Sequence, residues 1–321
     1  MSEVVHTAYE GDELRALDWG RIARDAEENC AHALKKVPNL PPDVSLEAFI
    51  RTAADVGPLD HYKYFDDAAK GMIERIGITC GAPAVRAFLR AALGRTISIW
   101  VDNGRYQRLP PLCAQYHAEQ LERIAHDPDV TSDWLDLGDD RFQKEFGITL
   151  MRLYVAGSHV VDPRCGISRS TVLREGLGKA LPKIGLIMRL GGFKPYLQSH
   201  LHTFHLEAFN EEGRKDFYHC CTELYSLHPQ CLGVFSLSWY YDPVLEQISP
   251  WLAYLRKVPL ANGAHLWHVQ DGGQAIIDAT AKSKKRRKLY EEGKYLPRTY
   301  MLIWGRKEQI EWARAHPRAV T

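Results

Sequence analysis

The first part of the chain shows apolar residues at helical spacing. Over residues 10–36, Leu14 and Ile22 fall on one side and charges lie elsewhere, so a helix is predicted there. Ser45 has the position of an N-cap before a second helix. Three further helices are predicted, over residues 64–78, 82–93 and 109–126, and Gly94 is taken as the end of the second. The β-branched run Thr96–Val101 is predicted to form a strand. The N-terminal region is therefore expected to be mostly helical.

The pattern changes near residue 180, where short apolar runs begin to alternate with helical patterns. This alternation is typical of a sheet flanked by helices. Strands are predicted over residues 184–190, 195–204, 231–241, 264–269 and 299–304. Helices are predicted over residues 205–228, from Pro250 to Arg256, and over residues 273–292. We expect an α/β (α+β) fold, with a mainly helical region over 1–180 and a mixed β-sheet with flanking helices over 181–321.

Composition places this chain among ordinary globular proteins. Of its 321 residues, 45% are hydrophobic and 25% are charged, and the net charge is +1. No apolar run reaches the roughly 18 residues that a membrane helix needs, and the N-terminal residues lack the apolar stretch of a signal peptide. The seven cysteines are irregularly spaced without a C-x-x-C pair, which argues against a disulfide framework or a cysteine-based zinc site. We expect a soluble, cytoplasmic protein that does not associate with membranes.

Two late segments carry a resemblance to a known family. Residues 251–269, WLAYLRKVPLANGAHLWHV, form a helix-then-strand pattern, and residues 289–295 read LYEEGKY. Together they resemble the GNAT family of acetyl-CoA-dependent N-acyltransferases, whose fold holds an acyl-CoA in a splayed gap between two strands. The likeness covers residues 185–305 and implies a GNAT-like domain that binds acyl-CoA or another acyl thioester.

The same resemblance suggests residues for acyl transfer. Tyr290 matches the tyrosine that protonates the departing thiolate in the family, although packing of its helix on the sheet is an alternative role. The family binds the CoA pyrophosphate through a glycine-containing loop at a helix N-terminus. The matching place is Gln247–Leu252, which contains Gln247, Ser249 and Trp251 but neither glycine. We therefore expect weak, salt-sensitive binding of free acetyl-CoA, with Arg286 as a possible phosphate ligand, and a carrier-protein-bound donor as the better substrate.

Three histidines form the densest polar group in the sequence. His200, His202 and His205 are spaced H-x-H-x-x-H, and on a strand the first two share a face. Such a group can provide the base that deprotonates an acceptor amine. Glu211 is a second candidate base, or else complements the helix dipole at a helix start. The alternative is that the three histidines bind zinc or iron, which we favour less than a metal-free site.

Aromatic residues and an acid follow the predicted strand 231–241. Trp239, Tyr240, Tyr241 and Asp242 stand where ligands bind in open α/β sheets, beyond the carboxyl end of a strand. They are candidates for the acceptor pocket, while core packing with an Asp-Pro turn would explain them nearly as well. The basic run 282–288 is interpreted as a solvated helix face near the cofactor, and nucleic-acid binding is the minority interpretation.

These patterns together predict an enzyme of the acyltransferase type. It would move an acyl group from a thioester to the amine of a small-molecule substrate, with an acyl carrier protein as a possible partner. Two other functions stay open from the sequence. One is a metal-dependent enzyme built on the histidine group, and the other is a non-catalytic binding protein derived from the GNAT fold.

Overall fold

The computed structural model describes residues 17–37, 39–55, 57, 61–202, 204 and 206–318. The chain forms two compact units, which we call the helical unit (Ala8–Asp162 with His202–Phe204) and the sheet unit (Pro163–Leu201 with His205–Ala319). The sheet unit begins after Asp162. The sequence prediction places this boundary later, at the change of pattern near residue 180. The expected α/β class, with helices first and a mixed sheet afterwards, is confirmed.

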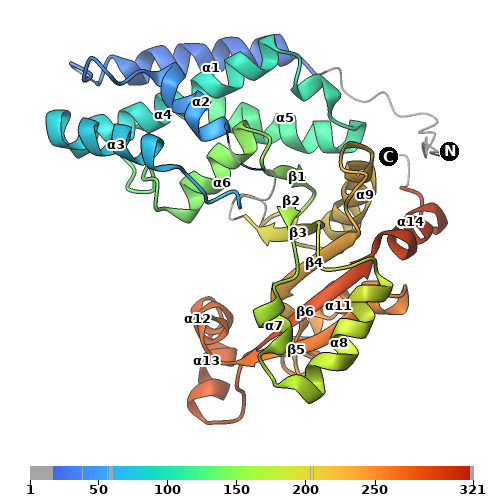
Figure 1. Cartoon of the computed structure of the whole chain (residues 1–321). Coiled ribbons are helices and arrows are strands. Elements are labelled where there is room, and N and C mark those ends of the chain that lie inside the picture. The colour runs from blue at the N-terminus through green and yellow to red at the C-terminus, as the bar shows by residue number, and fades with distance from the viewer. Residues whose placement is uncertain are drawn as a thin grey trace. The chain divides into compact units, whose positions relative to one another are not determined.

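The helical unit consists of helices followed by a short hairpin (Figure 1). Its elements are α1 (Trp19–Leu34), α2 (Leu46–Ala54), α3 (Asp67–Cys80), α4 (Ala82–Asp102), α5 (Pro111–His126), α6 (Asp140–Thr149), β1 (Tyr154–Ala156) and the beginning of β2 (His159–Cys165). The predicted N-cap is confirmed, because the Ser45 hydroxyl accepts the Ala48 N–H at 3.1 Å. Side chains thus satisfy backbone donors that the first helical turn leaves open.

One predicted strand in the helical unit is wrong. Thr96–Val101 belongs to α4, which continues past Gly94 instead of ending there. A Cβ on Gly94 would lie 2.4 Å from the backbone oxygen of Ala26 on α1. This glycine therefore lets two helices approach closely and is no stop signal. Burial of the apolar run in that helix contact outweighs its β propensity.

The sheet unit alternates strands and helices. After the end of β2, its elements are α7 (Arg169–Leu173), α8 (Leu177–Arg189), β3 (Tyr196–Leu201), α9 (Glu211–Leu227), β4 (Gly233–Ser238), α10 (Leu245–Ile248), α11 (Tyr254–Ala261), β5 (His265–Asp271), α12 (Gln274–Ala281), α13 (Lys284–Glu291), β6 (Arg298–Gly305) and α14 (Arg306–Ala315). The strand order is β1-β2-β3-β4-β6-β5. Strands β3 and β4 are parallel, and β6 is antiparallel to both of its neighbours. The predicted strands near 195–204, 231–241, 264–269 and 299–304 are confirmed.

Three other predictions in this unit need correction. Residues 184–189 belong to α8, with Leu190 as its C-cap, and not to a strand, since Ala180 and Ile187 recur at helical spacing against the core. The long helix over 273–292 is two helices, because Ser283 caps α13 by accepting the Arg286 N–H at 3.3 Å. Pro250 starts a single 3₁₀ turn, and the α-helix begins only at Tyr254.

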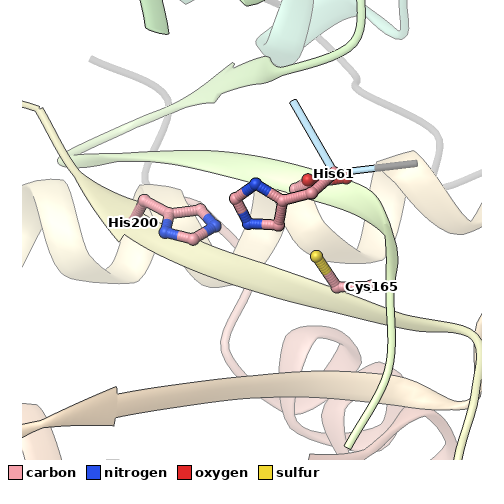
Figure 2. A group of neighbouring side chains, drawn as sticks. His61, Cys165 and His200 are labelled. Carbon is pink, nitrogen blue, oxygen red and sulfur yellow. The ribbon is translucent and has the colours of Figure 1, made fainter. Parts of the chain in front are cut away.

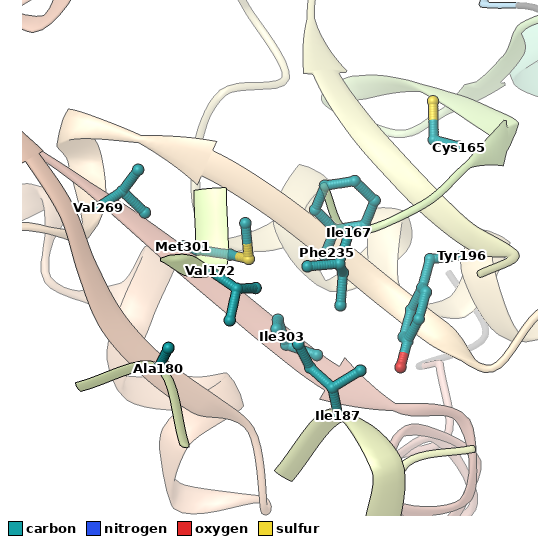
Figure 3. Packing of buried hydrophobic residues seen from close by; sticks show 10 residues of the cluster. All are labelled: Cys165, Ile167, Val172, Ala180, Ile187, Tyr196, Phe235, Val269, Met301 and Ile303. Atoms are coloured by element: carbon teal, nitrogen blue, oxygen red, sulfur yellow. The ribbon is translucent and has the colours of Figure 1, made fainter. Parts of the chain in front are cut away.

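Helices cover both faces of the strands in the sheet unit. On one face, α7 and α8 bury Val172, Ala180 and Ile187 against Met301 and Ile303 of β6 (Figure 3). Adjacent strand residues point to opposite faces. The next residue, Trp304, therefore faces the other side, where its ring packs on Tyr218 of α9 and Trp312 of α14. Within the described part of the chain, none of the helices combines the length and apolar character that crossing a membrane requires.

Candidate functional site

The two parallel strands of the sheet unit separate soon after they pair. Strand β4 pairs with β6 at all of its residues, from Gly233 to Ser238. Its register with β3 holds only at Leu197–Val234 and Gln198–Phe235 among the described residues. Beyond Phe235, the β3-facing edge of β4 has no β3 residue in register. The sheet therefore opens between two strands in its interior, toward their carboxyl ends.

Aromatic side chains lie at the carboxyl end of β4. The ring of Tyr240 packs on Phe209, which precedes α9, at 5.2 Å between centroids, and on Trp239 at 4.2 Å. These contacts connect the end of β4 to the segment that leads from β3 into α9. The Tyr240 N–H donates to the Ser238 hydroxyl at 3.1 Å, and the Asp242 N–H donates to the Trp239 carbonyl oxygen at 3.1 Å. Both of these backbone donors are therefore already used.

Helix α9 joins β3 to β4. Its N-cap Asn210 accepts the Gly213 N–H, and its first turn carries Glu211 and Glu212. These carboxylates complement the positive end of the helix dipole, so the helix start does not favour an anionic ligand. One turn further, Arg214 is buried among aromatic rings.

The Arg214 guanidinium makes two hydrogen bonds to phenols of the sheet unit. It donates from Nε to the Tyr218 hydroxyl and from Nη2 to the Tyr241 hydroxyl, each at 3.0 Å. Desolvation alone would lower the pKa of Arg214. The two phenols outweigh this effect and raise its pKa above the usual value, so the guanidinium stays charged. A buried cation is thus fixed beside the first turns of α9.

A tyrosine of α11 lies close to the same region. The Tyr254 hydroxyl is buried and has no hydrogen-bond partner among the described residues. Burial raises the pKa of Tyr254 to about 12, and the nearby charge of Arg214 opposes this while Glu211 and Tyr240 add to it. The phenol is therefore neutral and keeps its proton, next to the end of β4 and the beginning of α9.

The four residues predicted to bind the cofactor divide into two groups. Gln247 and Trp251 are exposed, and the Trp251 side chain has 61% of its surface accessible. Ser249 is fully buried and accepts a hydrogen bond from Arg286 Nη1 at 3.1 Å. Arg286 also donates from Nε to the carbonyl oxygen of Ala279 and stacks over the Trp239 ring at 4.7 Å. The Arg286 guanidinium is thus engaged within the protein and does not face an open phosphate site.

The predicted acceptor residues lie together at the end of β4 but differ in environment. Trp239 and Tyr241 are buried, and Tyr240 is half-buried. Asp242 is buried, accepts the Val244 N–H at 3.1 Å and lies 3.5 Å from the Arg298 guanidinium. Desolvation raises the pKa of the Asp242 carboxyl. Among the four, Tyr240 has the position closest to that of a ligand-facing residue, because it is the least buried.

His200 lies on β3, two residues beyond the last residue paired with β4. In the sheet unit, a ring nitrogen of His200 and the thiol sulfur of Cys165 at the end of β2 lie within 4.8 Å of each other (Figure 2). Cys165 belongs to the buried core and His200 is half-buried. A thiol and an imidazole at this separation are two of the ligand types that zinc prefers.

His61, also labelled in Figure 2, belongs to the helical unit. There, one of its ring nitrogens lies within 4.8 Å of a carboxylate oxygen of Asp162, whose Oδ2 accepts the Tyr62 N–H at 3.3 Å. Desolvation is the main cause that lowers the pKa of His61, and the Asp162 charge opposes it. This pair was not singled out from the sequence, because His61 and Asp162 are 101 positions apart.

The three predicted histidines do not form one group. Strand β3 ends at Leu201, so the alternation that would place His200 and His202 on one face stops between them. His202 is buried in the helical unit, with Nε2 3.6 Å from Glu145, and its Nδ1 accepts the Phe204 N–H at 3.2 Å. The group of possible metal ligands found among the described residues includes His200 but not His202. His205 lies outside the described residues.

Tyr290 lies at the surface of α13. Its side chain is 36% exposed and makes no hydrogen bond or ring contact with another described residue, while its backbone carbonyl accepts the Gly293 N–H at 3.0 Å. Sequence reasoning missed Tyr254 and Arg214, which the fold places beside Glu211 instead. The sequence gives only a partial indication of these residues. Tyr254 stands in the segment 251–269 that carries the family resemblance. Nothing in the sequence, however, reveals that its hydroxyl is buried.

No protein-family model matches the chain, and neither the curated proteins nor the solved structures contain a match. A function must therefore be inferred from the geometry of the chain alone.

Proposed function

We propose that the sheet unit is an acyltransferase that binds an acyl thioester in the opening between β3 and β4. The observation that supports this best is the loss of register beyond Phe235, while β4 stays paired with β6. Backbone N–H and C=O groups in a sheet interior require partners. An extended ligand with amide groups can supply them in the manner of an added strand. The pantetheine arm shared by acyl-CoA and acyl carrier proteins has this extended, amide-bearing form.

The same opening agrees with the resemblance to the GNAT family, in which the donor lies between two splayed strands. In the proposed reaction, an acceptor amine attacks the thioester carbonyl carbon. A C–N bond forms, the C–S bond breaks, and the amine proton and the thiolate must both be accommodated. A backbone N–H on the free edge of β4 between Ser236 and Ser238 stabilises the developing oxyanion. The N–H groups of Tyr240 and Asp242 are excluded from that role because they are already bonded.

Two side chains are assigned to the proton transfers. His200, on β3 beyond the last paired residue, accepts the proton of the amine. Tyr254 gives its proton to the leaving thiolate, because burial keeps its phenol neutral and its hydroxyl is not committed to another described residue. Tyr290 remains the alternative acid from the sequence, and Glu211 the alternative base. Tyr240 is assigned to the acceptor side of the opening.

The preferred acyl donor is inferred from the groups that would be available to bind the phosphates of CoA. The short α10 and the 3₁₀ turn at Pro250 offer no long helix start, and Arg286 is engaged with Ser249. The start of α9 carries two carboxylates. Free acyl-CoA therefore gains little from its phosphates, and a donor carried by an acyl carrier protein is favoured.

The proposal is tested by hydrogen exchange and by thiol release. Adding acyl-CoA or an acyl pantetheine should protect the backbone amides of residues 236–238, and the amides of β5 serve as the internal control. An acyl thioester with a panel of small amines should release free thiol. Protection without turnover would favour the non-catalytic binding protein that the sequence left open, and neither effect would exclude the donor site.

A further inference from the structure

Helix α8 presents an apolar face to solvent in addition to the face that it buries. Leu177, Leu181 and Met188 are 74%, 67% and 61% exposed. They recur at i, i+4 and i+11, which places them along one side of the helix. Between them lie Gly178 and Gly185, and a Cβ on either glycine would meet nothing within 4 Å. The outer surface of α8 therefore alternates aliphatic ridges with shallow hollows.

This face lies in a basic surface segment of the sheet unit. Residues 169–194 contain six basic side chains and a single acidic one, a net charge of +5, against +1 for the whole chain. The acidic one, Glu175, accepts hydrogen bonds from Lys183 at 2.6 Å and from His268 at 2.9 Å, so its charge is compensated within the protein. Arg189 and Lys194 are exposed at the far end of α8.

We propose that this surface, the docking face (the exposed residues of α7 and α8 with Arg189 and Lys194), binds the acidic helical surface of an acyl carrier protein. The inference rests on the proposed function, because it names the partner that delivers the acyl thioester. Acyl carrier proteins are small, helical and strongly acidic, so their charge complements the docking face. An aliphatic ridge with glycine hollows accepts the side-chain ridges of a helix, which is how two helices pack.

An anionic lipid surface would also attract cations and leucines, but the composition of the docking face favours a protein. Helices that lie in the lipid interface bury Trp, Phe or Leu on the apolar side, so exposed leucines alone do not distinguish the two partners. On α7 and α8 the exposed large apolar residues are all aliphatic. Two glycines and Pro182 on the outer side also shorten the apolar strip, which suits a contact of a few side chains. Figure 1 shows α7 and α8 on the outside of the sheet unit, where a partner can reach them.

Binding is measured with the full chain and a purified bacterial acyl carrier protein that carries an octanoyl group. The wild-type protein should bind it, and binding should weaken as salt is raised, because the contact is partly electrostatic. Leu181→Ser and Arg189→Glu should each weaken binding by about tenfold. Ile277→Ser on α12 and Lys285→Glu on α13 change equally exposed residues away from the docking face and should leave binding unchanged.

A parallel assay separates this inference from the proposed function. Turnover with octanoyl-CoA should be the same in wild type and in both docking-face variants, while turnover with the carrier-bound donor should fall in the variants. Absence of carrier binding, or equal binding in all four variants, would overturn the inference even if octanoyl-CoA is used. Carrier binding that depends on Leu181 and Arg189 without any acyl transfer would sustain the docking face and reject the acyltransferase. Vesicles with anionic phosphatidylglycerol form the third arm, and binding to them in place of the carrier would also overturn it.

Discussion

The ring of His202 faces the wholly buried carboxylate of Glu145, with 3.6 Å between Nε2 and the nearer oxygen. The same carboxylate accepts hydrogen bonds from Arg123 and, at 3.1 Å, from Gln120, and Arg141 lies 3.9 Å away. A histidine and two guanidinium groups thus share one acid in the interior of the helical unit. The geometry is that of a structural network, in which removing the acid leaves two half-buried guanidinium groups without their shared partner.

We therefore expect Glu145→Ala to lower the free energy of unfolding by about 3 kcal/mol. His202→Ala should cost about 1–2 kcal/mol, the scale for a disrupted buried polar contact. Urea denaturation of purified variants measures both. His200→Ala is the matched control, because its half-buried side chain should affect turnover more than stability. A stable His202→Ala variant without activity would return His202 to the catalytic role that the sequence predicted.

The proposed acyl transfer assigns the general acid to Tyr254, with Tyr290 as the alternative. Tyr254→Phe should lower turnover about 100-fold, the usual scale for loss of a general acid, and should leave the melting curve nearly unchanged because only a hydroxyl is removed. Tyr290→Phe should have little effect, since that side chain lies at the surface. Steady-state rates with an acyl thioester and thermal unfolding of both variants are the measurements. The opposite ranking of the two rates would support the assignment made from the family resemblance.

Metal content distinguishes acyl transfer from the metal-dependent alternative. If Cys165 and His200 bind zinc or iron, the purified protein should contain close to one equivalent, and Cys165→Ser should remove most of it. His202→Ala should leave the metal content unchanged, in contrast to a site built on the three histidines. Elemental analysis of dialysed protein gives the answer. Full activity of metal-free protein in a chelator would rule out a catalytic metal.

Binding of acetyl-CoA should be weak and should decrease with salt. The phosphates would contact side chains near solvent, and such contacts are screened at physiological ionic strength. Calorimetry at low and high salt measures this directly. Tight binding that does not respond to salt would show that backbone groups hold the pyrophosphate, against the inference from Gln247–Leu252.

The stability of the sheet unit should depend on pH through Glu175. Hydrogen bonds from Lys183 and then from His268 lower the pKa of this carboxyl to about 2 from its usual 4.5. A depressed folded-state pKa contributes stability above the unfolded-state value, and that contribution is lost as the pH falls from 4.5 toward 2. The Glu175→Gln variant should not lose stability through this group as the pH falls, because glutamine does not titrate. The difference in unfolding free energy between wild type and variant should therefore shrink over that range, and a constant difference would contradict the assignment.

Elements with a single clear periodicity could be predicted from the sequence. Helices α1 and α2 have one apolar side, and the Ser45 cap marks a boundary that any sequence reader can find. Strand β6 contains the apolar run 300–304, and β4 carries Val234, Phe235 and Leu237 among small residues. Local physics decides these elements, so tertiary contacts do not alter them.

Other elements depend on contacts between distant residues. From the sequence, Gly94 is predicted to end a helix. In the structure it instead allows close contact with the backbone of Ala26. Residues 184–190 resemble a strand because α8 is apolar on its exposed side as well as its buried side, which hides the helical period. The candidate site could not be predicted for the same reason. Tyr254 and Glu211 are 43 positions apart, and no local sequence pattern indicates that a hydroxyl is buried.

The separation of β3 from β4 has a thermodynamic consequence for the sheet unit. If the proposed donor pairs with the β3-facing edge of β4, it binds only the folded chain. Folding and donor binding are then linked equilibria, so saturating donor raises the stability of the native state by RT ln(1 + [L]/Kd). The melting temperature of the unit would then report how much of the proposed donor is bound. A thermal-shift screen of thioesters can find the donor before any acceptor is known.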